Sequence, residues 1–293
     1  MTEERKQEIL EIIRNTNRRP AQTGKPLYPE EIMAYPNLCE EIESISRTVD
    51  GFSYRMDILR AKNRGKNCPL FINIHGGGFI GPHRENDTYF SAYMADQIHG
   101  IAVDLDYTLS DAAPYPVALH QCMDALDYVA EHANTWGASA KDISVGGYSA
   151  GGALTAAMGI CCAERGGFVP KLQILCYPPL EYRIPDQYKI DAYDRQIGME
   201  RCKAFADLYF DDKKENFEDI HNSPLYAPRE ILAKQPKTLI LSAGLCNFRY
   251  EDEDYAICLA DAGAEVILKR FPEASHGFIP HFMDGWKEAA DLM

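Results

Sequence analysis

A serine flanked by glycines, within residues 147–151, is the part of this chain best suited to nucleophilic chemistry. The pattern is Gly-x-Ser-x-Gly, with Ser149 at its centre. A short β-leaning run precedes it at 143–145, and residues 153–163, rich in alanine and methionine, suit a helix. A serine on so sharp a strand-to-helix turn points its hydroxyl out of the sheet, although the same pentapeptide also occurs in ordinary turns. The N-terminus of the following helix favours negative charge that develops beside the serine.

A second stretch, His75-Gly76-Gly77-Gly78-Phe79, directly follows an apolar run at 69–74. Consecutive glycines free the backbone to turn its N–H groups toward one point, as an oxyanion hole requires. The alternatives are a flexible loop or a phosphate cradle. A phosphate-binding loop would carry a lysine after the glycines, and none follows here.

Near the C-terminus, His276 lies in a loop after the apolar run at 266–271. A lone histidine is usually structural, but a late histidine after a serine on a strand-to-helix turn has the chain order of a nucleophile and its general base. Six other histidines lack a comparable context: residues 83, 99, 120, 132, 221 and 281.

Strand-like and helix-like segments alternate from about residue 49 onward. The expected strands are 53–59, 69–74, 101–105, 143–145, 172–176, 238–242 and 266–271, and the expected helices are 116–133, 153–163, 252–262 and one that starts near Ile279. This alternation predicts an α/β fold with a mostly parallel central sheet and helices on both faces. We assign residues 49–293 to this main domain.

Two segments fall outside the alternation. Residues 3–15 form an amphipathic helical pattern, within an N-terminal segment (1–48) that we expect to pack on the main domain. Residues 181–233 are polar, aromatic and interrupted by prolines, which predicts a lid-like insertion over the site. Its aromatic residues are Tyr182, Tyr188, Tyr193, Tyr209, Phe210 and Tyr226, and we expect Tyr182, Tyr188 and Phe210 in lid or core packing rather than in contact with a substrate.

Composition limits the partners. The formal net charge of -14 over 293 residues argues against nucleic acid or an anionic membrane surface. The nine cysteines are scattered and lack metal-site spacing, and the charged N-terminus lacks the apolar stretch of a signal peptide. No segment reaches transmembrane length. We therefore expect reduced thiols, a cytoplasmic location and no bound metal.

Taken together, the motifs resemble those of the hormone-sensitive-lipase-like family of α/β-hydrolase carboxylesterases. The resemblance runs from about residue 50 to 280. It includes the His75–Phe79 loop, Asp106-Tyr107-x-Leu109, Pro114-Tyr115-Pro116, Gly147-Tyr148-Ser149-Ala150-Gly151-Gly152, Tyr177-Pro178 and His276-Gly277-Phe278. One difference in the serine motif is Tyr148, where the family has aspartate.

The resemblance implies an α/β-hydrolase fold with a helical cap, and it assigns the site residues. Ser149 would be the nucleophile and His276 its base, and the amides of Gly77, Gly78 and Ala150 would form the oxyanion hole. It also implies a small-molecule ester with a short or medium acyl chain as substrate, with no cofactor. The sequence does not indicate an oligomeric state.

The chain departs from the family at the third triad position. Where the family has a catalytic aspartate after the strand at 238–242, this chain has Cys246. A thiol of pKa about 8.5 is mostly neutral at pH 7 and stabilises an imidazolium poorly. Another carboxylate could serve instead, with Glu181 our first choice and Glu251 or Asp252 the alternatives. Otherwise Cys246 ionises beside His276, or the triad is truncated and activity is low or lost. Cys246 is alternatively only a small residue that the site tolerates.

The sequence therefore predicts ester hydrolysis through an acyl-enzyme. Two alternatives stay open. One is amide or formamide hydrolysis by the same residues, and the other is a catalytically weakened member of the fold that binds a small molecule. Loss of the acid alone from a serine-hydrolase triad costs roughly 10⁴-fold yet leaves catalysis above the rate in water.

Overall fold

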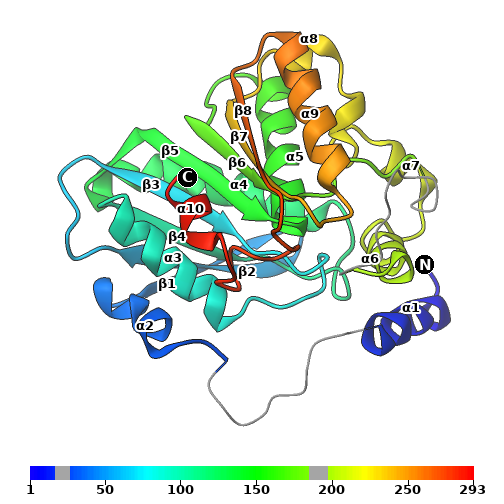
Figure 1. The fold of residues 1–293 in the computed structure, drawn as a ribbon, viewed down its shortest axis with the longest axis horizontal. Helices are drawn as coiled ribbons and strands as arrows, with labels where there is room; N and C mark the ends of the chain where they lie inside the picture. Colours follow the sequence, from blue (N-terminus) through cyan, green and yellow to red (C-terminus); the bar gives the residue numbers. More distant parts are fainter. Residues whose placement is uncertain (17–26, 185–196) are drawn as a thin grey trace.

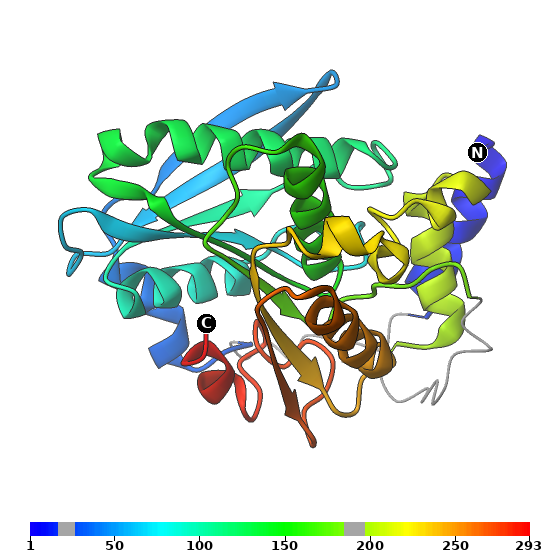
Figure 2. The same ribbon diagram turned by 90° about the horizontal axis from the view of Figure 1, so that it is seen from above.

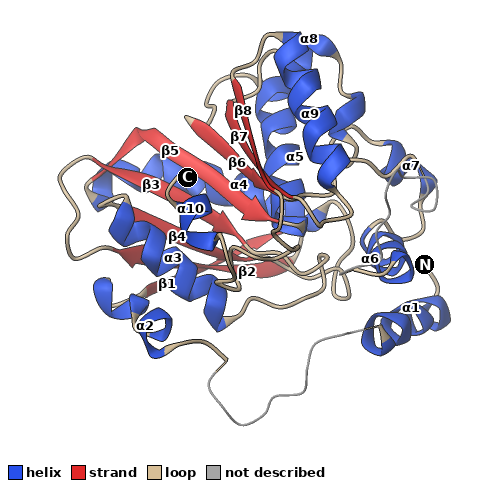
Figure 3. Cartoon of the chain, in the orientation of Figure 1, coloured by secondary structure: helices blue, strands red, loops and turns tan. Residues whose placement is uncertain are grey.

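The computed structural model describes residues 1–16, 27–184 and 197–293 and is built around one eight-stranded sheet (Figures 1 and 3). The strand order is β1-β2-β4-β3-β5-β6-β7-β8. The strands are β1 Glu43–Val49, β2 Phe52–Arg60, β3 Cys68–Ile74, β4 Ile101–Asp106, β5 Ala138–Tyr148, β6 Leu172–Cys176, β7 Lys237–Ala243 and β8 Val266–Phe271. In the sheet, each pair of neighbouring strands from β4 through β3, β5, β6 and β7 to β8 is parallel. This confirms the predicted mostly parallel sheet.

The first edge of the sheet differs from the sequence prediction. β1 and β2 form an antiparallel hairpin, and β2 also runs antiparallel to β4. The turn between them places Asp50 and Gly51 at positive φ, a conformation that glycine and aspartate tolerate. The strand β1 was not predicted because its residues are mostly exposed or half-buried and give no apolar run. Regular βα alternation therefore begins only after this hairpin.

The central strands are apolar on both sides because helices cover both faces. Alternate residues point to opposite faces, so Ile72 and Val103 join one core cluster while Phe71 and Ala102 join another. The first core contains residues of α4 (Val117–His132) and α5 (Ala150–Arg165), and the second contains residues of α3 (Glu85–Gln97). Figure 2 shows these helices as layers on either side of the sheet.

A third core lies at the β7–β8 end of the sheet. It joins α5 to α9 (Arg249–Ala262) and α8 (Arg229–Leu232) through residues such as Ile160, Leu259 and Leu232. The predicted helices over 116–133, 153–163 and 252–262 are confirmed, each with small shifts at its ends.

One predicted helix is misplaced, and helix α3 was not predicted. The chain from Ile279 to Gly285 forms turns, with Phe282 and Gly285 at positive φ, and the last helix α10 spans only Trp286–Ala290. Helix α3 was not predicted, because its buried face includes polar side chains such as Asn86, Asp87 and Ser91 and lacks a clean apolar stripe.

The N-terminal helix α1 (Glu3–Asn15) confirms the amphipathic pattern. Its buried Ile9 and Ile13 pack against Ala204 and Leu208 of α6 (Met199–Tyr209), so the two helices lie side by side (Figure 1). Two short helical segments, α2 (Glu30–Met33) and η1 (Tyr35–Leu38), lie before β1.

The 181–233 segment contributes α6, α7 (Lys214–Glu218), η4 (Pro224–Tyr226) and α8. As expected, Phe210 is buried in the core and Tyr182 packs against that core. Tyr209 is also buried there, whereas Tyr226 is exposed. Tyr188 and Tyr193 lie outside the described residues. The division into an N-terminal segment, a main domain and a lid stays a prediction.

Candidate active site

The turn at Ser149 joins the end of β5 to the start of α5. Ser149 has φ 54° and ψ -120°, a strained combination for a residue with a side chain. Its backbone N–H donates to Cys176 O at 2.9 Å, which ties the turn to β6. A Cβ on Gly147 would lie 2.8 Å from Ile74 O, so a larger residue there would push the strand and the turn apart.

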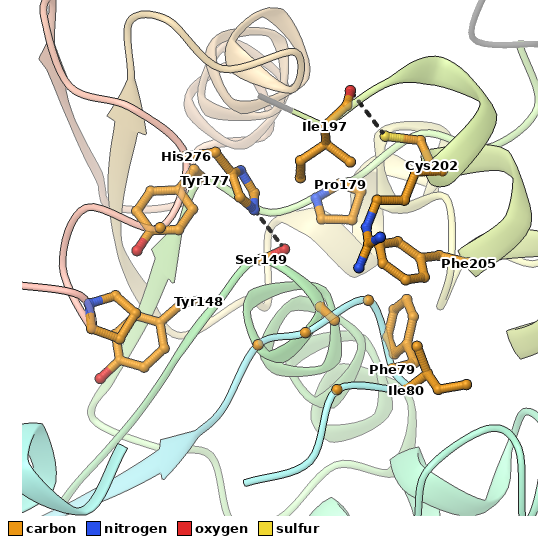
Figure 4. A pocket seen from close by; sticks show the side chains of 18 of the residues that line it. Phe79, Ile80, Tyr148, Ser149, Tyr177, Pro179, Ile197, Cys202, Phe205 and His276 are labelled. Atoms are coloured by element: carbon orange, nitrogen blue, oxygen red, sulfur yellow. Dashed lines mark hydrogen bonds between the residues drawn. The ribbon is translucent and has the colours of Figure 1, made fainter. Parts of the chain in front are cut away.

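His276 faces Ser149 directly. Its Nε2 lies 2.8 Å from Ser149 Oγ, as Figure 4 shows. The loop after β8 carries the imidazole, and Gly277 follows at φ 84°. Burial, and then the nearby His281, lower the pKa of His276 to about 3. The imidazole is therefore neutral near pH 7, as a general base must be.

The glycine loop lies beside this pair and lines the same cavity as Ser149 and Ala150. Gly77 and Gly78 have φ 121° and 64°, which a residue with a Cβ rarely adopts. Ala150 is the first residue of α5, so its N–H has no partner within the helix. The three predicted oxyanion-hole positions therefore border one cavity with the serine.

The side chain of His75 supports the glycine loop through contacts with its backbone and with Tyr107. Its Nδ1 lies 2.8 Å from Gly76 O, and its ring stacks on Tyr107 with centroids 4.3 Å apart. The Tyr107 hydroxyl donates to His75 O at 3.1 Å. Burial lowers the pKa of His75 to about 4, so this ring is also neutral. These contacts fix the backbone from which the predicted oxyanion donors project.

A sulfur atom lies at the other nitrogen of His276. Cys246 Sγ is 3.0 Å from Nδ1, and the Phe248 N–H donates to the same sulfur at 3.4 Å. Burial, and then the Asp252 charge, raise the pKa of Cys246 well above its usual value. A neutral thiol thus lies where a triad carries its acid, and it supplies no negative charge to an imidazolium.

The three candidate substitute acids have other surroundings. Glu251 Oε2 accepts the N–H groups of Leu180 and Glu181 at 2.8 and 3.0 Å, and Glu181 Oε1 accepts those of Arg183 and Ile184 at 2.5 and 2.8 Å. Both carboxylates therefore support the loop that follows β6. Asp252 is fully buried, and burial raises its pKa well above the usual range. The identity of the acid stays a prediction.

Comparison with known proteins gives the family. Residues 71–280 match the family model described as alpha/beta hydrolase fold. Esterase LipI of Mycobacterium tuberculosis is 30% identical over 217 residues, which cover 72% of this chain and 66% of that protein. Bovine hormone-sensitive lipase is 29% identical over 120 residues, covering 41% of this chain and 16% of the lipase. The chain belongs to the hormone-sensitive-lipase-like family of α/β-hydrolases.

Solved structures agree with this α/β-hydrolase fold. A hyperthermophilic esterase from Pyrobaculum calidifontis superimposes with a TM-score of 0.78 at 24% identity, covering all of this chain and 96% of that one. A thermostable esterase from Pseudomonas putida has a TM-score of 0.76 at 25% identity, covering 99% of this chain and 94% of that one.

This chain spans less than two thirds of the length of LipI, at 66%. Within the described residues, none of the helices has the length and apolar character needed to cross a membrane.

The cavity beside Ser149, of about 670 Å³, is also lined by residues that the sequence motifs did not single out. His281 lines it and lies 3.1 Å from the Tyr28 hydroxyl through Nδ1, and Phe205 of α6 also lines it (Figure 4). Tyr148, which replaces the family's aspartate, is buried with its ring edge-on to Phe90. No motif marks His281 or Phe205, because distant segments bring them to the cavity, whereas Tyr148 lies within the serine motif.

One buried ion pair lies close to the glycine loop. His83 Nε2 is 2.7 Å from Asp104 Oδ2, and Asn73 donates to the same carboxylate at 3.0 Å. Although burial lowers it, the carboxylate raises the pKa of His83 to about 9 overall. The His83 and His75 rings lie edge to face, with their centroids 5.7 Å apart, so the His83–Asp104 ion pair helps to hold His75 in place beside the glycine loop.

Proposed function

We propose that this protein is a serine carboxylesterase that hydrolyses short- to medium-chain carboxylic esters through an acyl-enzyme. The observation that carries the proposal is the 2.8 Å contact between Ser149 Oγ and His276 Nε2, made on a strained strand-to-helix turn beside a glycine loop. The family and the relatives named as esterases support the same reaction class.

In this mechanism Ser149 Oγ attacks the ester carbonyl while His276 Nε2 takes its proton. The amides of Gly77, Gly78 and Ala150 stabilise the oxyanion of the tetrahedral intermediate. His276 then donates the proton to the leaving alcohol, and a water activated by the same nitrogen releases the acid. Each proton transfer uses a histidine that is neutral in the resting site.

Cys246 is expected to weaken this reaction. In the productive tautomer the Nδ1–H points toward Cys246 Sγ, which is a poor hydrogen-bond acceptor. If the thiol donates to Nδ1 instead, the imidazole proton sits on Nε2 and the base is blocked. A neutral sulfur permits both tautomers, whereas a carboxylate would select the productive one.

The sulfur at Nδ1 also favours a second candidate function. A site with this cavity and a weakened triad suits a protein that binds a small molecule and turns it over slowly or not at all. Binding without turnover has no need for the Ser149–His276 contact, so we rank hydrolysis first. The cytoplasmic location, and an alternative preference for amides, stay predictions.

Hydrolysis of p-nitrophenyl acetate and butyrate tests the proposal, with Ser149→Ala run beside the wild type. We expect a measurable wild-type rate that falls at least 10³-fold in the variant, because the acyl-enzyme cannot form without Oγ. Nitroanilides with the same acyl groups test the amide alternative. A wild-type ester rate equal to that of Ser149→Ala would reject hydrolysis and favour the binding function.

A further inference from the structure

The ring of Phe205 presses against the glycine loop. A Cβ built on Gly78 would overlap the Phe205 ring, at 2.5 Å from Cγ and 2.6 Å from Cε2, so the ring already contacts the glycine itself. Gly78 and Phe205 line the same cavity as Ser149. An aromatic wall therefore stands beside the predicted oxyanion hole.

Neighbouring groups hold this wall in place. Phe205 packs on the cluster formed by Ile9 and Ile13 of α1 with Leu208 of α6. The Arg201 guanidinium lies 4.9 Å from the centroid of the Phe205 ring and donates to Ile13 O at 2.5 Å. Because α1, Arg201 and Gly78 all restrict the ring, a substrate chain cannot push it aside without disturbing the packing of α1 on α6.

The chemistry of the site orients the substrate relative to this wall. His276 Nε2 must reach the leaving oxygen to protonate it, so the alcohol part of the ester lies on the histidine side of Ser149. The carbonyl oxygen points to the predicted amide donors. The acyl chain takes the remaining direction, and in Figure 4 Phe205 and His276 lie on opposite sides of Ser149.

We propose that Phe205 sets the upper limit on acyl-chain length, so that the site accepts acetyl to butyryl esters and discriminates against longer acyl chains. This inference rests on the proposed function and narrows its substrate class. The alcohol side is not restricted by Phe205, so esters of one short acid with alcohols of different length should be affected alike by changes at this residue.

The test uses two ester series. One is p-nitrophenyl esters from acetate to decanoate, which varies only the acyl chain, and the other is acetates of alcohols of increasing length. We expect the wild-type kcat/KM to fall beyond butyrate. Phe205→Ala should raise the octanoate-to-acetate ratio of kcat/KM about tenfold or more, because each added methylene then finds room in an apolar pocket.

Phe217→Ala is the matched control. Phe217 belongs to the same 181–233 segment and packs on an apolar cluster, but it does not line the cavity. Phe205→Leu provides a smaller change in case the alanine variant loosens α6, and thermal unfolding of each variant checks the fold. An unchanged octanoate-to-acetate ratio in a folded Phe205→Ala enzyme would overturn the proposal, as would a response confined to the alcohol series. Absence of any Ser149-dependent hydrolysis would instead reject the proposed function.

Discussion

At the scale of single residues, the most informative position is Cys246. The geometry around His276 is that of a complete triad, with one nitrogen 2.8 Å from Ser149 Oγ and the other 3.0 Å from Cys246 Sγ. Only the charge is missing, because burial keeps the thiol neutral. The imidazolium that forms during catalysis is itself disfavoured by burial, which lowers the pKa of His276 to about 3.

Replacement Cys246→Asp should therefore increase activity. We expect kcat to rise about 10- to 10³-fold, below the roughly 10⁴-fold cost of losing a native acid, because the surrounding loop has not adapted to a carboxylate. A carboxylate at this position also favours the protonated imidazole and raises the pKa of His276. The acid limb of kcat/KM, where the rate falls as His276 takes up a proton, should thus move from near pH 3 to higher pH.

Steady-state kinetics between pH 4 and 9 measure the change in kcat and show whether an acid limb that is absent from this range in the wild type appears in it for Cys246→Asp, with Cys246→Ser as the matched neutral control. A serine variant that gains as much as the aspartate variant would show that charge is not the cause. A wild-type acid limb already near pH 6.5 would contradict the buried, low-pKa histidine.

At the scale of elements, the start of α9 carries an unusual buried carboxyl group, that of Asp252. Asp252 is fully buried on the inner face of this helix, where burial raises its pKa well above the usual range. A carboxyl whose folded-state pKa is raised stabilises the fold below its unfolded pKa of about 3.9, and this contribution is lost as pH rises through the folded pKa. At neutral and alkaline pH, Asp252 therefore costs stability.

We predict that Asp252→Asn raises the melting temperature at pH 8 by several degrees and leaves it nearly unchanged at pH 4. The amide is uncharged at both pH values, and one unit of pKa shift corresponds to about 1.4 kcal/mol. Thermal unfolding at the two pH values measures the difference, with Asp254→Asn on the exposed side of α9 as control. An equal change at both pH values would refute the linkage. A large loss of kcat in the same variant would favour Asp252 as the substitute acid.

The helices and strands also differ in how well the sequence pattern predicts them. The buried strands β3, β4 and β6 are predominantly apolar despite the buried Asn73, Asp104 and Gln173, and α1 has a clear apolar stripe, so the local pattern suffices to predict them. Helix α3 buries Asn86, Asp87 and Ser91, and Asp87 accepts the Arg84 N–H at 2.9 Å at the start of the helix. Because polar residues share its buried face, the helix has no continuous apolar stripe that a one-dimensional pattern could detect.

At the scale of the whole molecule, the sheet brings three distant segments to one edge. The loops after β3, β5 and β8 supply the glycine loop, Ser149 and His276, and these loops meet because the three strands are parallel. This convergence is why motif order alone predicted the serine and histidine as neighbours. The cavity wall was not predictable in this way, because Phe205 reaches Gly78 only through the packing of α1 on α6.

We propose Ser149 as the nucleophile of a serine hydrolase. Incubation with a p-nitrophenyl phosphonate, followed by mass spectrometry of the digested protein, tests this claim most directly because the reagent traps the attacking oxygen. We predict a single phosphonyl adduct on the peptide that contains Ser149, together with loss of ester hydrolysis and no labelling of Ser149→Ala. An unlabelled wild-type protein, or an adduct on Cys246, would contradict it.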